Sequence, residues 1–196
     1  MKFLFDLGGV FFDWDPNHFF NDIFDKAEER EYFLTEVCND EWNIQQDAGR
    51  TIKEAEAVLI PKFPQYEKQI KMYYQNHRKM IRGIFNSSIK VLNKLKKQNY
   101  ECYVLSNWSA ETFVGMTDDY PFLQSFNGLL ISGEDKLMKP DAAIYELAIS
   151  RFNLIPQETV FIDDKLENIE AAKKLNLKTI HLVDPNIIEL EIDKFI

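Results

Sequence analysis

The chain has 196 residues, 45% of them hydrophobic and 14% aromatic, which is enough for one buried core with a smaller lobe attached. This composition excludes an intrinsically disordered chain. The 32 acidic residues outnumber the 23 basic ones and give a net charge of −9, which argues against nucleic acid or an anionic membrane as a partner. A metal ion and one lysine can reverse the field locally, so a small anionic substrate stays compatible with this charge.

The chain has only two cysteines, Cys38 and Cys102, and they lack the spacing of a metal site. They indicate reduced thiols in a cytoplasmic protein. The apolar residues at the N-terminus end at Asp6, far too early for the core of a signal peptide or for a membrane span. We therefore expect a cytoplasmic protein without membrane association.

The first predicted element is a short strand over residues 3–5, which ends at Asp6. A carboxylate at the end of a buried strand is costly unless it binds a metal, a cation or a substrate. Gly8 and Gly9 follow, and glycines allow the backbone to approach a ligand closely. Asp6 is therefore the first candidate for a functional residue.

The segment of residues 16–85 interrupts the alternation of strands and helices. It is rich in Phe, Glu, Lys and Gln, and its helical stretches are broken at Gly49, Pro61, Pro64 and Gly83. We predict a lobe of about four helices, inserted after the first strand. The main α/β domain then consists of residues 1–15 and 86–196.

Within this lobe, residues 42–50 place amides, an acid, an aromatic ring and an arginine beside Gly49. This stretch predicts either a surface that closes over a polar substrate, with Trp42 stacking on it, or an ordinary joint between two helices. His77 lies in a charged run and His181 lies in a strand pattern, so we expect both to be structural or solvated.

Four further apolar runs predict strands over residues 102–105, 129–131, 160–162 and 179–183. Helical periodicity between them predicts helices that contain Ile89, Ile144 and Leu166, and the chain closes with a short helix in residues 187–196. Continuous apolar runs that alternate with helices indicate a doubly wound parallel α/β sheet. Ligands bind beyond the carboxyl ends of the strands in such sheets. The polar residues that follow each strand are therefore expected to meet.

Three carboxylates, those of Asp6, Asp163 and Asp164, are expected at this edge of the sheet. They would raise one another's pKa unless a cation lay among them. Mg²⁺ fits, because it prefers oxygen ligands and retains water and phosphate in its shell. The backbone carbonyl of Gly8 can add a ligand, so the predicted metal ligands are Asp6, Gly8, Asp163 and Asp164.

Ser106 and Asn107 follow the second strand and offer a hydroxyl and backbone N–H groups to phosphate oxygens. Lys139 adds a point charge that can act on a phosphate and on a nucleophile. Trp108 is predicted to contact a substrate, with packing in the core as an equal alternative. Each motif alone is more often a turn, an exposed lysine or a helix cap, but their occurrence together favours a site. The predicted substrate-binding residues are Ser106, Asn107, Trp108 and Lys139.

These motifs resemble those of the haloacid dehalogenase-like (HAD) superfamily, and the resemblance covers almost the whole chain. The matching residues are, in order of the four motifs, the nucleophile Asp6, then Ser106, then Lys139, and finally Asp163-Asp164 with Asn168. The lobe of residues 16–85 lies where these enzymes carry a helical cap. The resemblance thus implies a Rossmann-like core with a helical cap, and Asp6, Ser106 and Lys139 as catalytic residues.

The glycine turn is similar to that of glucose-1-phosphatase-type members, which share the glycine at Gly8. The resemblance implies Mg²⁺-dependent hydrolysis of small phosphorylated metabolites through an aspartyl-phosphate at Asp6. Most phosphatases of the superfamily have an aspartate at the position of Gly8, where acid–base catalysis is worth ~10²–10⁴-fold. Without it, the substrate has a good leaving group, such as a sugar 1-phosphate, or Asp13, Asp15 or His18 replaces the acid, or the protein is a catalytically weak scaffold.

A 2-haloacid dehalogenase is the alternative enzyme, because the expulsion of halide needs no proton. Dehalogenases of the superfamily use no metal and lack the full acidic pair, whereas Asp163-Asp164 would be costly without a cation. The residues therefore favour the phosphatase. A response-regulator receiver carries similar groups in a different order and without an inserted lobe. The sequence predicts no oligomeric state.

Overall fold

Strand β1 (Lys2–Phe5) lies at the centre of a five-stranded parallel sheet with the order β5-β4-β1-β6-β7. The computed structural model describes residues 1–196 and places the other strands at β4 (Glu101–Ser106), β5 (Gly128–Ile131), β6 (Thr159–Asp163) and β7 (Lys178–His181). All neighbouring pairs are parallel. The predicted doubly wound α/β fold is therefore confirmed.

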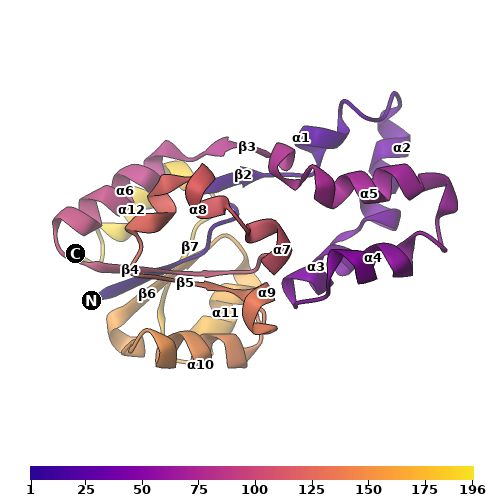
Figure 1. Cartoon of the computed structure of the whole chain (residues 1–196). Helices are drawn as coiled ribbons and strands as arrows, with labels where there is room; N and C mark the ends of the chain where they lie inside the picture. The colour runs from indigo at the N-terminus through magenta and orange to yellow at the C-terminus, as the bar shows by residue number, and fades with distance from the viewer.

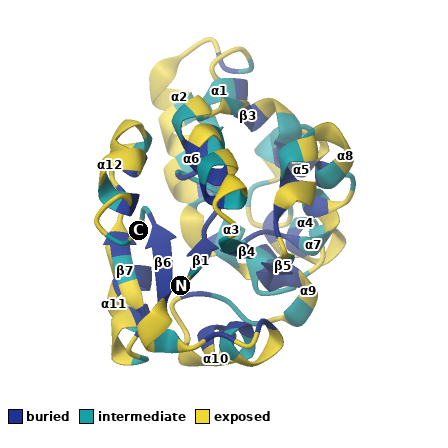
Figure 2. Ribbon diagram, turned by 90° about the vertical axis from the view of Figure 1, so that its left-hand side faces the viewer, coloured by how far each residue is buried: buried dark blue, intermediate teal, exposed yellow.

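The continuous apolar runs arise because helices cover both faces of the sheet. Phe3 and Phe5 point into one hydrophobic cluster, whereas Leu4, between them, points into the other. Figure 2 shows the central strands as buried and the outer faces of the helices as exposed. Because both faces of such a strand are buried, its apolar residues are consecutive and do not alternate with polar ones.

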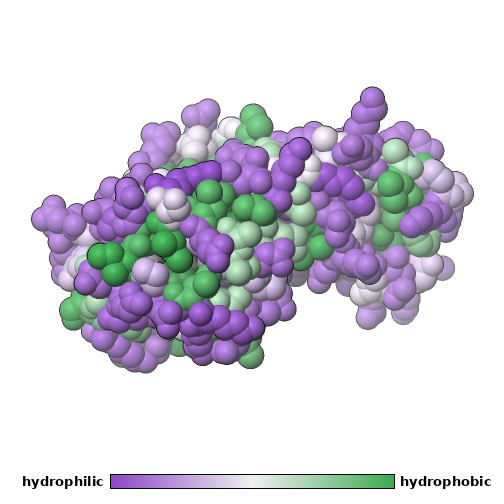
Figure 3. Space-filling view, turned by 90° about the horizontal axis from the view of Figure 1, so that it is seen from below, coloured by the Kyte–Doolittle hydropathy of each residue, from purple (hydrophilic) through white to green (hydrophobic).

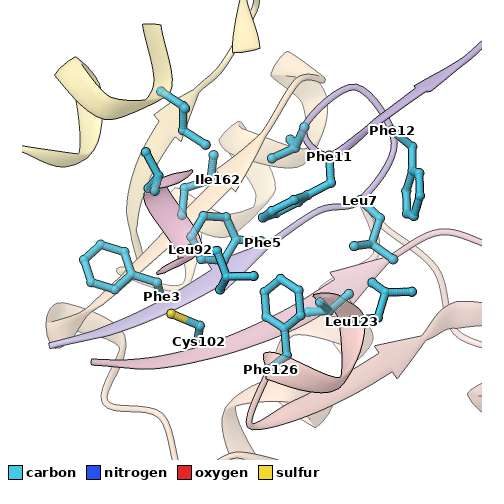
Figure 4. Packing of buried hydrophobic residues seen from close by; sticks show 14 of the residues in the cluster. Phe3, Phe5, Leu7, Phe11, Phe12, Leu92, Cys102, Leu123, Phe126 and Ile162 are labelled. Carbon is cyan, nitrogen blue, oxygen red and sulfur yellow. The ribbon is translucent and has the colours of Figure 1, made fainter. Parts of the chain in front are cut away.

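Helices α6 (Asn86–Lys97) and α12 (Ile188–Ile192) lie on one side of the sheet, and α10 (Ala142–Arg151) and α11 (Leu166–Lys174) lie on the other (Figure 1). Val91, Leu92 and Leu95 of α6 are buried at helical spacing and form an apolar stripe. Figure 4 shows the core on this side, where phenylalanine rings from β1 and from the following turn pack against Leu92 of α6 and Phe126. Three single-turn helices complete this lobe, α7 (Ala110–Phe113), α8 (Met116–Asp119) and α9 (Ser132–Asp135).

The second lobe is helical and has a hydrophobic core of its own, which includes Phe20, Phe33 and Tyr73. Its helices are α1 (Asn17–Phe20), α2 (Ala27–Tyr32), α3 (Asp40–Asp47), α4 (Ile52–Leu59) and α5 (Glu67–Gln75). A π-helical turn (Phe33–Val37) continues α2. The lobe therefore has one α-helix more than the four predicted, because the single turn α1 is too short to give a periodic signal.

The two lobes are joined by a pair of antiparallel strands, β2 (Phe12–Trp14) and β3 (Ile81–Ile84) (Figure 1). The pairing of β2 with β3 brings the two ends of the inserted segment together. The backbone N–H of Phe85 donates to the carbonyl of Phe11 and so extends this pairing by one hydrogen bond. The division into residues 1–15 with 86–196 and residues 16–85 stays a prediction.

Much of the surface is hydrophilic. Figure 3 shows hydrophilic residues over most of the face seen from below, with groups of hydrophobic residues among them. None of the helices is both long and apolar enough to cross a bilayer. Cys38 and Cys102 are both buried free thiols.

Candidate active site

The carboxyl ends of three neighbouring strands bring the predicted acids together. Asp6 follows β1, while Ser106 ends β4 and Asp163 ends β6. Carboxylate oxygens of Asp6, Asp163 and Asp164 all lie within 4.8 Å of one another. Asp6 and Asp163 are buried and Asp164 is partly exposed, so the cluster has one open side.

The carboxylate of Asp6 is held at one oxygen only. Its Oδ1 atom accepts hydrogen bonds from the backbone N–H of Leu7 and the hydroxyl of Ser106, both at 2.7 Å, and lies 3.0 Å from Nζ of Lys139. Oδ2 has no hydrogen-bond partner within the protein. The arrangement thus fixes the carboxylate and leaves one oxygen available to an electrophile.

Ser106 lies at the site as predicted, but its contact differs from the expectation. A hydroxyl group has a single hydrogen, and that of Ser106 is donated to Asp6. In this arrangement Ser106 orients Asp6 and has no hydrogen left for a phosphate oxygen.

Lys139 is buried, so the alternative of an exposed loop lysine is wrong. Its three hydrogens are directed at Asp6, at Oδ2 of Asp163 at 2.7 Å and at the carbonyl of Leu105 at 2.9 Å. Burial alone would lower the pKa of Lys139, but the carboxylates of Asp163 and Asp6 outweigh it and raise this pKa above its ordinary value. Lys139 therefore stays charged beside Asp6 and Asp163.

The carboxylate of Asp163 is fully occupied by donors. Besides Lys139, it accepts from the side-chain amide of Asn168 at 3.0 and 3.1 Å and from the backbone N–H of Lys165 at 2.8 Å, at the start of α11. Asp163 thus fixes Lys165, the residue that precedes α11, and is the partner of Lys139. Asn168 Oδ1, by contrast, is a buried oxygen without a partner. Such an oxygen suits a water molecule in the shell of a cation.

Asp164 faces the cavity and depends on a glycine next to it. Gly9 has a φ of +67°, and a Cβ atom there would lie 2.4 Å from Oδ2 of Asp164. Burial, followed by the charge of Asp163, raises the pKa of Asp164, and burial likewise raises the pKa of Asp6. A cluster with one ammonium group among three carboxylates is short of positive charge, so these residues fit a divalent cation.

Asn107 braces the loop that carries Lys139. Its side chain donates to the carbonyl of Lys139 and accepts from the backbone N–H of Lys139, both at 2.9 Å. Its own backbone N–H makes no hydrogen bond within the protein. Asn107 lines the cavity, so this N–H group is the free donor of the predicted phosphate cradle.

Trp108 packs in the core, one of its two predicted roles, and it also lies where a substrate would be contacted. Its ring packs against Phe12 and Phe113 in the core, and it also lines the cavity. The indole N–H donates to the hydroxyl of Thr112 at 3.0 Å. Trp108 therefore forms part of the cavity wall, and both its ring and its N–H group are held in place.

A cavity of about 350 Å³ lies over the acidic cluster, and its other wall comes from the helical lobe. That wall is mostly polar and consists of Asp40, Asn43, Ile44 and Asp47 of α3, Tyr74 of α5, and His77. The sequence predicted that the stretch containing Asn43 and Asp47 either closes over a polar substrate or is an ordinary joint between helices, without singling out either residue. Tyr74 was missed.

The expectation that Trp42 stacks on a substrate is wrong. Trp42 is buried in the core of the helical lobe, where its indole N–H donates to the carbonyl of Ala55 at 3.2 Å. Helix α3 turns Trp42 and Gln46 towards that core, whereas Asn43 and Asp47, one position further along, line the cavity.

Of the two roles expected for His77, structural or solvated, the solvated one is wrong, and His77 also lines the cavity. It is buried, its Nδ1 atom has no partner, and burial followed by the charge of Arg78 lowers its pKa to about 4. Ile70, Tyr73 and Tyr74 precede it at helical spacing on the buried side of α5. That continuing spacing is the signal that could have placed His77 inside.

None of the three residues proposed to replace an acid at Gly8 lines the cavity. Asp13 pairs with Arg82 at 2.8 Å and with His18 at 3.0 Å, and Asp15 accepts from the backbone N–H of Asn17. These side chains form ion pairs and hydrogen bonds at the junction of the two lobes.

Comparison with known proteins agrees with this geometry. Residues 3–182 match the haloacid dehalogenase-like hydrolase family. The chain belongs to this family. It is therefore a HAD-like hydrolase, as the sequence motifs implied, and its five-stranded sheet is the core of that fold.

Relatives of this HAD-like hydrolase include a curated phosphatase and solved structures. The sesquiterpene phosphatase astK of Aspergillus oryzae is 25% identical over 181 residues, which are 92% of this chain and 89% of that protein. A HAD family enzyme of Bacteroides thetaiotaomicron, solved with magnesium and inorganic phosphate, is 25% identical, with 91% and 92% of the two chains covered and a TM-score of 0.69. A predicted HAD-like hydrolase of Porphyromonas gingivalis shares the fold, at 19% identity, 98% and 96% coverage and a TM-score of 0.73.

Proposed function

We propose that this HAD-like hydrolase is a Mg²⁺-dependent phosphatase of small, polar phosphorylated metabolites, acting through an aspartyl-phosphate at Asp6. The proposal rests on the hydrogen bonding of the two carboxylate oxygens of Asp6. One oxygen is fixed by three donors and the other is free, beside two further acids that fit a divalent cation. The relatives named as a phosphatase and solved with magnesium and phosphate support it.

In the first step, the free Oδ2 of Asp6 attacks phosphorus, and the bond from phosphorus to the ester oxygen breaks. Lys139, Ser106 and the N–H of Leu7 hold the other oxygen, which keeps the attacking one aimed at the cavity. In the second step, water attacks phosphorus, the bond to Asp6 breaks, and the carboxylate is restored. The Asn107 N–H donates to an oxygen of the phosphoryl group throughout.

Asp6, Asp164 and the carbonyl of Gly8 would hold Mg²⁺, with Asp163 shaping the site. When bound, the ion supplies positive charge against the phosphoryl oxygens. We base this assignment on the carboxylate and carbonyl oxygens present, which Mg²⁺ prefers as ligands, and on the shortage of positive charge in the cluster.

The cavity walls support a small substrate rich in hydroxyl groups. The side-chain amide N–H groups of Asn43 have no partner within the protein and can donate. The hydroxyl hydrogens of Tyr74 and Thr112 are donated to Asn43 and to the carbonyl of Ser109, so these two hydroxyls offer acceptors, and neutral His77 adds an unpartnered nitrogen. Residues 16–85 would act as the cap that sets specificity, while residues 1–15 and 86–196 bind the phosphoryl group. Sugar 1-phosphates meet these requirements and carry a better leaving group than ordinary alkyl phosphates.

The test is a hydrolysis panel of glucose 1-phosphate, acetyl phosphate and 2-chloropropionate, each with Mg²⁺ and with a chelator, run beside Asp6→Asn. The proposal predicts phosphate release that needs Mg²⁺ and that Asp6→Asn abolishes. Chloride release without metal, and no phosphate release, would overturn it in favour of a dehalogenase. Binding of phosphate without any turnover would indicate a scaffold.

A further inference from the structure

The proposed reaction lacks a proton donor for the leaving group. Gly8 stands two residues after Asp6 and has no side chain, and Asp13, Asp15 and His18 lie outside the cavity. An alkoxide is a poor leaving group without a proton, so the acid must come from elsewhere in the cavity wall.

Asp47 is the carboxyl group that meets this need. It is the last residue of α3 and lines the cavity with Asp6, Asn107 and Lys139. Ser109, in the loop that follows Asn107, lines the same cavity, so this cap residue lies in one lining with the loop at the end of β4. Asp47 therefore stands on the wall opposite the phosphoryl site, where the leaving group must lie.

We propose that Asp47, carried by the cap, protonates the leaving group and then activates the water that hydrolyses the intermediate. This inference rests on the proposed phosphatase function and adds the residue that replaces the acid absent at Gly8.

The surroundings of Asp47 favour a carboxyl group that exchanges its proton near neutral pH. Burial, together with the charge of Asp6, raises the pKa of Asp47 to about 7, although Lys165, Lys139 and the Ser109 N–H oppose the rise. The other titratable groups at the cavity are Asp40 on the same helix, His77 and Tyr74 of the cap, and Asp164 of the core. A catalytic acid or base is most effective when its pKa lies near the working pH.

The proton balance closes with this single carboxyl group. As Asp6 attacks phosphorus, the departing oxygen takes the electron pair of its bond to phosphorus and the proton of Asp47, which gives an alcohol and an Asp47 carboxylate. Water then attacks the phosphorus of the intermediate and gives a proton to Asp47, while Asp6 regains its electron pair. Phosphate is released and Asp47 is again protonated.

The contacts of the cap hold Asp47 in this place. The backbone N–H of Ile52 donates to Glu111 of the core at 2.7 Å. Gly49, with φ at +95°, lies so close to the core that a Cβ atom there would be 2.7 Å from Cγ of Lys136. Only one residue separates Asp47 from Gly49, so this contact with the core helps to position the acid.

The test compares Asp47→Asn with wild type on an alkyl phosphate, glycerol 1-phosphate, and on p-nitrophenyl phosphate, whose leaving group needs no proton. Turnover of the alkyl phosphate should fall ~10²–10⁴-fold, and the limb of its pH profile near pH 7 should vanish. With p-nitrophenyl phosphate, the first burst of p-nitrophenol should keep its wild-type rate, while later turnover slows. Glu41→Gln, at an exposed position of the same helix outside the cavity, is the matched control and should behave as wild type.

A rescue variant separates proton transfer from a structural role. Nothing lies within 4 Å of a Cβ atom at Gly8, so an aspartate fits there. Adding Gly8→Asp to Asp47→Asn should restore turnover of the alkyl phosphate, which a lost cap contact would not permit. An equal loss in the burst and in alkyl turnover, or no loss, would overturn the role of Asp47.

The two proposals fail in distinguishable ways. If the wild type hydrolyses no phosphate ester, both fail. If the wild type is active and Asp6→Asn is inactive, but Asp47→Asn keeps the wild-type pH profile on glycerol 1-phosphate, only the acid role is refuted.

Discussion

The ammonium group of Lys139 lies 3.0 Å from Oδ1 of Asp6, and neither side chain is more than 10% exposed. The same ammonium group also pairs with Asp163. Buried charges persist only when they are paired and hydrogen-bonded, so Lys139 stabilises the arrangement of acids as well as aiming the proposed nucleophile.

Replacing Lys139 with methionine should destabilise the protein strongly, because it leaves two buried carboxylates without their cation. We expect a loss of roughly 3–5 kcal/mol in the free energy of unfolding, measured with urea in the presence of a chelator. Mg²⁺ should recover part of this loss. Lys173→Met is the control, since its pair with Glu170 is exposed to water and contributes little to stability. A Lys139→Met protein as stable as this control would contradict the account.

Gly9→Ala should weaken metal binding without unfolding the chain. The new methyl group would collide with the carboxylate of Asp164 and require a left-handed backbone at alanine. We expect Mg²⁺ affinity to fall by about 10–100-fold, measured as the Mg²⁺ concentration that raises the thermal midpoint. Gly83→Ala, where a Cβ atom meets nothing within 4 Å, is the control. Unchanged Mg²⁺ affinity in Gly9→Ala would place the metal elsewhere.

The sheet and most of the acidic cluster could be predicted because both follow from short sequence signals. A buried parallel strand is a continuous apolar run, and the residue after it must lie at the carboxyl edge of the sheet. Asp6, Ser106 and Asp163 therefore meet, although most of the chain separates the first from the last. The hydrogen bonds of Ser106 could not be predicted, since the direction of a hydroxyl depends on distances that only the folded chain defines.

The cap wall could not be predicted, because it depends on how one lobe sits against the other. Asn43 and Asp47 differ from Trp42 and Gln46 by a single position on α3, and that position decides which side faces the cavity. The sequence gives the period of such a helix but not its rotation about its own axis. For a related reason the sequence left both a structural and a solvated role open for His77, since its polar neighbours concealed the buried face of α5.

The buried imidazole of His77 should make acid weaken the protein. Its pKa is about 4 in the folded state, against 6.5 ordinarily, so the unfolded chain binds more protons between these values. The free energy of unfolding is therefore unaffected by protonation of His77 above about pH 6.5, and it decreases as the pH falls towards 4. His77→Phe keeps an aromatic ring among Trp14, Tyr74 and Trp108 but cannot titrate.

Relative to His77→Phe, the wild type should lose roughly 3 kcal/mol of unfolding free energy between pH 7 and pH 4. Urea unfolding at each pH, with a chelator present, measures the difference between the two proteins. Parallel stability curves over this range would show that His77 is not held neutral by burial.

The most direct measurement of the central claim is mass spectrometry of the protein quenched in acid within milliseconds of mixing with acetyl phosphate and Mg²⁺. The account predicts one phosphoryl group on the peptide that contains Asp6, absent from Asp6→Asn and lost on longer incubation as phosphate appears. Phosphate release by the wild type with no phosphoryl group on that peptide at any time, or with the group on another residue, would contradict it.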